Sequence, residues 1–423
     1  MDAARPVLRL VSPLPPARGG IADHAAMLLP GQTWGISAAG RNWGAAEMPA
    51  PVVARRPGPR VLLVAPMVSH PARQGNSARL AAFGAALRAR GAAVELLYYG
   101  LDGLSPPQQA AMQAAWDGFH FQPALPHATQ KFPGFWGLDD WCPEALRAAV
   151  AGLQRRQGFQ AVVANYVWLS GVLEGLTGPL KLVDTHDVFG DRHLVAARQG
   201  LAPNWYFTSQ AEEARGLARA DAVLAIQSDE AAVLRQRGAA RVLTVGHWPG
   251  AETRPEGVQL ARFGVLASGN PWNQAAVQGL DAALAGAADV EWLLAGGICS
   301  VPGLRLGSAP LRLGAVERVA DFYGAVDCVL NPMQGGTGLK VKTVEALAHG
   351  MPVMGTADAF AGLGARHPAQ QATDAAALLP MLRDYAARDG FRAEVAAASA
   401  GLARDYAAEV AQHYDALMTL IGG

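Results

Sequence analysis

Between two apolar runs the chain reads Gly335-Gly336-Thr337-Gly338-Leu339-Lys340-Val341-Lys342-Thr343-Val344-Glu345. Only four of the 35 basic residues in the protein are lysines, and two of those four lie in this stretch. A lysine ammonium is a compact point charge, and glycines let backbone N–H groups approach a ligand closely. Glycines, ammonium groups and a helix start in succession are typical of a site that binds phosphate.

The residues on both sides of this stretch predict a strand–turn–helix–strand unit. We expect a strand at 328–331, a turn with positive φ angles at 335–338 and a helix at about 339–349. Gly350 would end that helix, and a second strand would follow at 353–354. The turn and the helix N-terminus would then face the same ligand.

Glu345 adds a carboxylate to this unit. It would stand ~10 Å along the helix axis from Gly338, because the rise is about 1.5 Å per residue. That is roughly the span from a pyrophosphate to a ribose, whose two hydroxyls a carboxylate could accept. The alternative is a plain glycine-rich turn followed by an exposed ion pair between Lys342 and Glu345.

Composition and charge exclude several classes of protein. The 423 residues include 35 basic and 35 acidic side chains, and a chain without net charge offers no footprint for a nucleic acid. Three widely spaced cysteines argue against a disulfide framework and against a structural zinc site. No run approaches the ~18 apolar residues of a membrane span, and no signal-peptide pattern is visible. We therefore expect a cytoplasmic protein.

Short apolar runs alternate with helical stretches along most of the chain. Strands are expected at 61–65, 94–99, 161–164, 181–184, 222–226, 241–245, 262–267 and 291–295, with helices such as 77–90 and 273–285 between them. This alternation predicts an α/β protein with doubly wound parallel sheets. A Pro- and Gly-rich break divides it into domains at 56–248 and 262–402, joined by a linker at 249–261. A helix at 403–423 would pack back on the first domain.

The first 55 residues fit this pattern less well. A strand at 8–12 followed by a glycine turn and a short helix would make a partial βα unit. It would either add an edge strand to the sheet or form a loosely packed arm. We favour the strand at 61–65 as the true first strand, because only that unit completes β-α-β.

Two common nucleotide motifs are absent. In a P-loop a Lys and a Ser or Thr directly follow the last glycine, whereas Leu339 follows Gly338 here. No GxGxxG opens a first βα unit, which argues against a dinucleotide oxidoreductase.

The sequence from Gly335 to Val353 resembles the donor-site signature of glycosyltransferase family 4. Other places that agree are Gly75-Asn76, Gly269-Asn270, and Gly314-Ala315-Val316 before Tyr323. The resemblance covers roughly residues 60–420. It implies the GT-B fold, in which two tandem Rossmann-like domains face a cleft, and a retaining, metal-independent enzyme. It also implies a nucleoside-diphosphate sugar as donor substrate and no other cofactor.

The resemblance assigns roles on the C-terminal side of the cleft. Residues expected to contact the donor nucleotide are Gly269, Asn270, Gly335, Gly336, Thr337, Gly338, Leu339 and Glu345. Glu345 would hold the ribose hydroxyls. Lys340 and Lys342 would act in catalysis by balancing the charge of the leaving diphosphate.

The chain departs from the family in two places. Many members have a glutamate that contacts the transferred sugar, at the position where Thr337 stands here. Many also have an Arg or Lys soon after the first strand of the second domain, where this chain has Asn270, Trp272 and Asn273. Without that glutamate, backbone amides of the Gly-Gly-Thr-Gly loop would meet the sugar and the phosphate. Without the Arg or Lys, Lys340 and Lys342 would carry most of the countercharge for the leaving diphosphate.

On the N-terminal side the resemblance points to His186, which follows the strand at 181–184 and would face the sugar. Asp187 could orient it. Loop residues expected near the sugar or the acceptor are Gly75, Asn76, Gly19 and Gly20. Two alternatives remain: His186 is a loop histidine without a chemical role, or a metal is bound by His186, Asp187, Asp191 and His193.

Two weaker features belong to the same half. The aromatic segment 132–141 could form an acceptor platform, touch a membrane surface or fill the core. Gln227 and Ser228 are expected to cap a helix near the cleft, with a small chance of acceptor contact.

These observations favour a glycosyltransferase that moves a hexose-type sugar to a hydroxyl acceptor. By the habit of the family, the acceptor would be a polysaccharide, a lipid-linked glycan or another hydroxyl compound, with peripheral contact at the inner face of the membrane. A GT-B epimerase or phosphorylase is an alternative, although no lysine has the setting of a pyridoxal site. A non-catalytic subunit that binds sugar nucleotides is the third.

Overall fold

The computed structural model describes residues 7–13, 43–49, 58–72, 74–124, 129–203, 205–254, 261–316, 318–336 and 338–423. The chain divides into two units, Met1–Arg55 and Arg56–Gly423. In the first unit the predicted strand is confirmed as β1 (Val7–Pro13), which pairs antiparallel with β2 (Trp43–Pro49). The edge-strand alternative is wrong, because β1 belongs to this two-stranded sheet. Gly19 and Gly20 lie outside the described residues.

Seven parallel strands form the N-terminal sheet of the second unit. They are β3 (Arg60–Ala65), β4 (Ala93–Gly100), β5 (Gly118–Pro123), β6 (Ala161–Asn165), β7 (Leu180–Asp184), β8 (Ala222–Ala225) and β9 (Val242–Thr244). Their order is β5-β4-β3-β6-β7-β8-β9, with Val61 opposite both Val94 and Ala161. The central strands are buried on both faces, which explains their unbroken apolar sequences.

Helices connect the strands of this sheet. They are α2 (Gly75–Ala89), α3 (Pro106–Ala115), α4 (Glu144–Gln157), the 3-10 helix η1 (Val167–Leu173), α5 (Arg192–Arg198), α6 (Gln210–Leu217) and α7 (Ser228–Gln236). Gly91 (φ 91°) and Gly158 (φ 64°) follow two of them, where a left-handed residue ends a helix at little steric cost.

Five parallel strands form the C-terminal sheet in the order β12-β11-β10-β13-β14. The strands are β10 (Phe263–Leu266), β11 (Trp292–Ala295), β12 (Leu311–Gly314), β13 (Cys328–Asn331) and β14 (Val353–Gly355). The helices are α8 (Pro271–Ala283), α9 (Val319–Tyr323), α10 (Val341–Ala348) and α11 (Leu378–Ala387), with 3-10 turns η2 (Gly297–Ser300), η3 (Ala357–Phe360) and η4 (Pro368–Gln370). The prediction of two doubly wound parallel sheets is confirmed.

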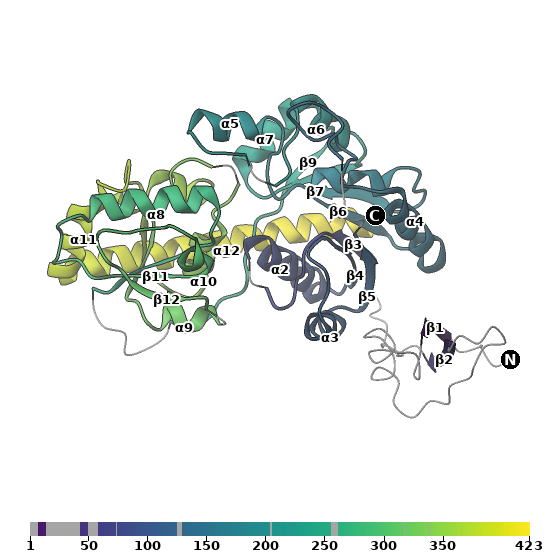
Figure 1. Ribbon diagram of the computed structural model, residues 1–423, viewed down its shortest axis with the longest axis horizontal. Helices are drawn as coiled ribbons and strands as arrows, with labels where there is room; N and C mark the ends of the chain where they lie inside the picture. The colour runs from purple at the N-terminus through teal and green to yellow at the C-terminus, as the bar shows by residue number, and fades with distance from the viewer. Residues whose placement is uncertain are drawn as a thin grey trace. The chain divides into compact units, whose positions relative to one another are not determined.

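The last helix, α12 (Asp389–Gly422), runs from the C-terminal sheet to the N-terminal sheet (Figure 1). The domain boundary expected between residues 402 and 403 falls inside this helix. The helix continues through Gly401, because one glycine in a helix interior costs only about 1 kcal/mol relative to alanine. At one end the Ser399 hydroxyl accepts a hydrogen bond from the Val353 N–H at 3.0 Å. At the other end Asp415 pairs with Arg90 of the N-terminal half at 2.7 Å.

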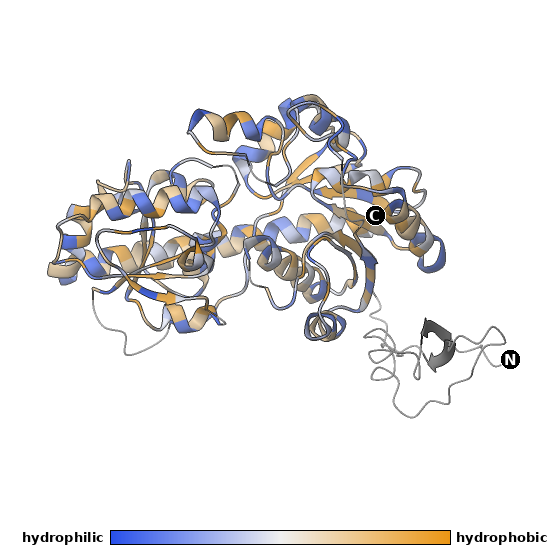
Figure 2. Cartoon of the chain, viewed as in Figure 1, coloured by the Kyte–Doolittle hydropathy of each residue, from blue (hydrophilic) through white to orange (hydrophobic). Residues whose placement is uncertain are grey.

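Apolar residues concentrate on the strands and alternate with polar residues along the helices (Figure 2), and the strand residues form most of the buried core. The C-terminal sheet divides its strand residues between two cores: Val329 joins the core that continues into the N-terminal half, and Leu330 joins a separate one. This follows from the alternation of side chains along a strand. Within the described ranges, no helix combines the length and the apolar content needed to cross a membrane.

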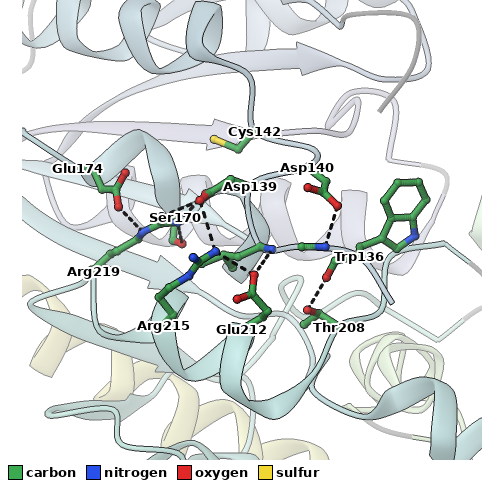
Figure 3. Close-up of polar contacts among 12 residues, drawn as sticks. Trp136, Asp139, Asp140, Cys142, Ser170, Glu174, Thr208, Glu212, Arg215 and Arg219 are labelled. Atoms are coloured by element: carbon green, nitrogen blue, oxygen red, sulfur yellow. Dashed lines mark hydrogen bonds and ion pairs between the residues drawn. The ribbon is translucent and has the colours of Figure 1, made fainter. Parts of the chain in front are cut away.

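A polar network fixes the aromatic segment 132–141 (Figure 3). Asp139 accepts hydrogen bonds from Arg219 at 2.7 and 2.8 Å, and the Thr208 hydroxyl donates to the Trp136 carbonyl at 2.6 Å. Trp136 and Trp141 pack against the core at partly buried positions. Of the three interpretations of this segment, the contacts of these two rings favour core filling.

Candidate active site

A large cavity of about 1000 Å³ lies between the two sheets, lined by loops that follow their strands. This is the edge at which ligands bind in parallel α/β sheets. Predicted site residues that line it are Gly75, Asn76, His186, Asp187, Gly269, Asn270, Gly336, Gly338, Leu339, Lys340 and Lys342. Gly335 and Glu345 are not among its lining residues, and Thr337, like Gly19 and Gly20, lies outside the described part of the chain.

Three glycines of the glycine loop (residues 335–339) have the backbone that the sequence predicts. Gly335, Gly336 and Gly338 have φ angles of 67°, 76° and 79°. These values favour glycine, and any L-residue with a side chain would be strained there. The Gly335 N–H is already used, since it donates to Asp358 at 2.6 Å. Helix α10 starts at Val341, directly behind the loop.

Lys340 is largely buried at the end of the loop. Its Nζ donates to the Gly338 carbonyl at 3.0 Å, so the ammonium group braces the turn that precedes it. Burial lowers the pKa of Lys340, while the carboxylates of Asp187, Asp358 and Glu230 act in the opposite direction. An anionic ligand in the cavity would add to that opposing effect and favour the charged lysine.

Lys342 and Glu345 form an ion pair along α10, with 2.6 Å between Nζ and Oε2. Such a pair is the one that the alternative interpretation, a plain glycine-rich turn, predicted. The pair is not fully exposed, since the Glu345 side chain retains only 12% of its accessible surface. Lys342 also lines the large cavity, whereas Glu345 lies one turn further along the helix. The ion pair therefore leaves Lys342 available to a ligand in the cavity.

His186 lies at the opposite wall, in a left-handed backbone conformation with φ 57°. Its Nε2 is 3.0 Å from Asn165 Oδ1 and 3.3 Å from Asp184 Oδ2, and its ring stacks on Tyr166 at 4.4 Å. Burial lowers the pKa of His186 to about 4; Asp184 opposes this effect and the Arg79 charge adds to it. The imidazole is therefore neutral near pH 7 and can exchange hydrogen bonds without carrying charge.

The expectation that Asp187 orients His186 is wrong. One Asp187 oxygen accepts from the Val188 N–H at 2.8 Å, and the other pairs with Arg192 at 3.1 Å. The left-handed backbone at His186 turns its ring toward β6 and away from its chain neighbour. Asn165 and Asp184 orient the imidazole instead.

Sequence reasoning missed the residues that hold this wall together. Arg79 of α2 makes a two-pronged ion pair with Asp184, at 2.6 and 3.0 Å, and also donates to the Val245 and Gly246 carbonyls. Arg79 and Asp184 are both fully buried. Asn165 and Asp184 are the last residues of β6 and β7, and a polar residue at the end of an apolar strand was the available signal.

The alternative metal site is not assembled. Asp191 accepts from Gln210 at 2.6 Å, and the His193 ring packs against Phe207 at 5.1 Å. In the described ranges, no three His, Cys, Asp or Glu side chains are grouped so that they could hold an ion.

The remaining loop residues shape the cavity. A Cβ added to Gly75 would lie 3.3 Å from Val341, so the starts of α2 and α10 approach closely across the cleft. Asn270 caps α8 by accepting from the Asn273 N–H at 2.8 Å, and its side chain amide reaches Ser268. Asn270 is thus a structural cap as well as a lining residue.

Comparison with known proteins identifies the fold. No protein-family model and no curated protein matches the chain. Among solved structures, TarM is similar with a TM-score of 0.62 at 7% identity, over 86% of this chain and 99% of its own. Anabaena HepE in complex with UDP and glucose has a TM-score of 0.59 at 15% identity, over 85% of this chain and 99% of its own. Sucrose-phosphate synthase from Thermosynechococcus elongatus has a TM-score of 0.58 at 18% identity, over 85% of this chain and 100% of its own. The second unit therefore has the GT-B fold, with two Rossmann-like domains that face a cleft, as the resemblance predicted.

Proposed function

We propose that this protein is a retaining glycosyltransferase that moves a hexose-type sugar from a nucleoside diphosphate to a hydroxyl acceptor without a metal ion. The observation that carries the proposal is the pair of walls around the large cavity. A glycine loop and two lysines line one wall, and a neutral histidine lines the other. The GT-B fold supports the proposal, as does HepE, a protein of similar fold whose structure holds UDP and glucose.

The nucleotide would lie on the C-terminal wall. Gly336 and Gly338 permit close approach of a diphosphate to the backbone, because no Cβ stands in the way. Glu345 would accept hydrogen bonds from the ribose hydroxyls. Its ion pair with Lys342 is compatible with this role, since a carboxylate has acceptor sites for several donors.

The leaving diphosphate would be stabilised electrostatically. Lys340, Lys342 and the N-terminus of α10 converge on the same end of the cavity. Fixed positive charge and helix N–H groups stabilise negative charge that develops in a transition state. In a front-face transfer without an enzymic nucleophile, the acceptor oxygen bonds to the anomeric carbon on the face from which the diphosphate departs, and the proton of the acceptor hydroxyl passes to the departing phosphate oxygen.

The acceptor hydroxyl would approach from the N-terminal wall. His186, held by Asn165 and stacked on Tyr166, would direct one hydrogen bond to the sugar. Gly75 and Asn76 line the same side and would contact sugar or acceptor. A glycan, a lipid-linked glycan or another hydroxyl compound fits this role, and closure of the two domains would exclude water.

Incubation of the purified protein with a panel of UDP-, GDP- and ADP-sugars tests the proposal. Released nucleoside diphosphate is measured by coupled assay, and the sugar is analysed by NMR. Slow donor hydrolysis that accelerates with a hydroxyl acceptor supports a glycosyltransferase. Formation of the 2-epimer would indicate an epimerase, and nucleotide binding without turnover would indicate a non-catalytic subunit.

A further inference from the structure

A small cavity of about 300 Å³ adjoins the large one at the glycine loop. Gly336, Gly338, Lys340 and Arg192 line both cavities, so the loop and its lysine lie between them. Its volume is at the lower end of the range for small-molecule sites. A group attached to a phosphate held at the loop could therefore extend into it.

The small cavity contains buried polar atoms without partners. Both carboxyl oxygens of Glu230 and the Oε1 of Gln227 are buried, and they lack a hydrogen bond to any described residue. The two side chains are only 5% and 8% exposed, and both line the cavity. Buried polar groups in folded proteins are almost always hydrogen-bonded. Three such oxygen atoms around one cavity indicate that a ligand supplies their hydrogen-bond partners.

The surroundings of Glu230 restrict what that ligand is. Burial and the nearby Asp187 carboxylate raise the pKa of Glu230 well above its usual range, against the opposing charges of Arg79 and Lys340. The backbone of Gly338 also favours the ionised form. A hydroxyl can donate to a carboxylate or accept from a carboxylic acid, so it satisfies Glu230 in either state.

The other side chains around the small cavity are partly charged (Arg192, Asp229, Arg237, Lys340 and Asp358) and partly apolar. Val188, Val195 and Val233 line it together with Glu230 and Gln227. A sugar ring has hydroxyls along its edge and C–H groups on its faces, and this combination of side chains suits both. The Arg237 guanidinium is already paired with Glu213 and with the Gly190 carbonyl, so it does not call for an anionic ligand.

We propose that the small cavity receives one edge of the sugar ring of the nucleotide donor, with Glu230 and Gln227 hydrogen-bonded to hydroxyls on that edge, while the opposite edge stays in the large cavity toward His186. The inference rests on the proposed function, because the glycine loop must hold the diphosphate for the attached sugar to enter. It adds two specificity-determining residues from α7 and the loop before it, in the domain opposite the glycine loop.

Calorimetry with matched pairs of ligands tests the inference. Each pair consists of a nucleoside diphosphate (UDP, GDP or ADP) and its glucose or mannose conjugate. The pair that the wild-type protein binds is then used to compare the variants. Glu230→Ala and Gln227→Ala should each weaken binding of the nucleotide sugar, by about 10- to 100-fold for Glu230, since a hydrogen bond to an ionisable group is removed. Binding of the free nucleoside diphosphate should stay within about twofold. Glu144→Gln, at an exposed position of α4, is the control and should change neither.

Thermal melting separates this role from a structural one. A buried carboxyl without a partner does not stabilise the fold, so Glu230→Gln and Glu230→Ala should melt at or above the wild-type temperature. Unchanged nucleotide-sugar affinity in folded Glu230→Ala would overturn the inference. Equal loss of affinity for the nucleotide and its sugar conjugate would overturn it too, and so would a lower melting temperature of both Glu230 variants. Failure of wild-type to bind any nucleotide would instead contradict the proposed function itself.

Discussion

The two walls of the large cavity are built in different ways. The C-terminal wall comes from one contiguous stretch, the glycine loop and the start of α10, and it presents Lys340 and Lys342 to the cavity. The N-terminal wall gathers Arg79, Asp184 and His186 from separate elements, with Arg79 and Asp184 lying 105 residues apart. Its charges are used up internally: Arg79 neutralises Asp184, and His186 is uncharged. In our account, phosphate chemistry therefore belongs to the first wall and orientation of hydroxyl groups to the second.

Arg79→Met should have the largest effect if the N-terminal wall depends on its buried ion pair. Removing one partner leaves Asp184 buried without a countercharge, which typically costs about 3–5 kcal/mol of unfolding free energy. Urea denaturation followed by circular dichroism measures it. Asp289→Ala, which breaks the exposed pair with Arg383, is the control and should leave the midpoint unchanged. Equal midpoints for Arg79→Met and wild-type would show that the pair does not support this wall.

The C-terminal wall should behave in the opposite manner, with loss of rate rather than loss of stability. Lys340→Met and Lys342→Met should each lower turnover by about 10²–10³, because a charge contact in the transition state disappears. Lys181→Met, which removes a surface lysine paired with Asp221, should retain full rate. Steady-state release of nucleoside diphosphate is the measurement. Wild-type turnover in both single variants and in the double variant would exclude the phosphate role.

Glu345→Ala tests whether the carboxylate on the first turns of α10 binds the nucleotide. Loss of a carboxylate that accepts from two ribose hydroxyls should weaken binding of the nucleoside diphosphate about 10- to 100-fold. Calorimetry on the folded variant gives the affinity. If it is unchanged, the ion pair with Lys342 is the only function of Glu345.

The buried histidines give the N-terminal half a pH dependence of its own. Burial lowers the pKa of His186 to about 4 and that of His247 to about 3. Between pH 6.5 and about 4 the unfolded chain therefore binds more protons, so stability is complete above pH 6.5 and is lost as the pH falls. At pH 4 the loss is on the order of 3 kcal/mol for each histidine, since one pKa unit corresponds to about 1.4 kcal/mol. His247→Phe should flatten a plot of urea midpoint against pH, and a slope identical to wild-type would contradict this assignment.

Much of the C-terminal wall could be predicted from the sequence because its signals are local. The φ angles of Gly335, Gly336 and Gly338, the strand before them and the helix after them follow from residues close together in the chain. Most strands of both sheets were predicted for the same reason. The edge strands β5 and β12 were missed, because an edge strand such as β12 is largely exposed and lacks a strong apolar run.

The N-terminal wall could not be predicted in this way because its partners are distant in sequence. Asp187 was assigned to His186 as its chain neighbour, yet the ring turns toward Asn165, which lies 21 residues away. Nothing in the local sequence distinguishes Arg79 from the other arginines of the helical stretches, and only the folded chain pairs it with Asp184. Glu230 follows the expected cap residues Gln227 and Ser228 and was not singled out, although it lines the small cavity together with the glycine loop of the other domain.

If the C-terminal wall alone neutralises the donor diphosphate, the protein should remain active in excess EDTA. Wild-type protein is incubated with the nucleotide sugar that it hydrolyses or transfers, with and without EDTA, and the release of nucleoside diphosphate is followed. We expect nearly the same rate in both, because Lys340, Lys342 and the glycine loop would provide the countercharge. Activity that EDTA abolishes and that manganese or magnesium restores would contradict this expectation.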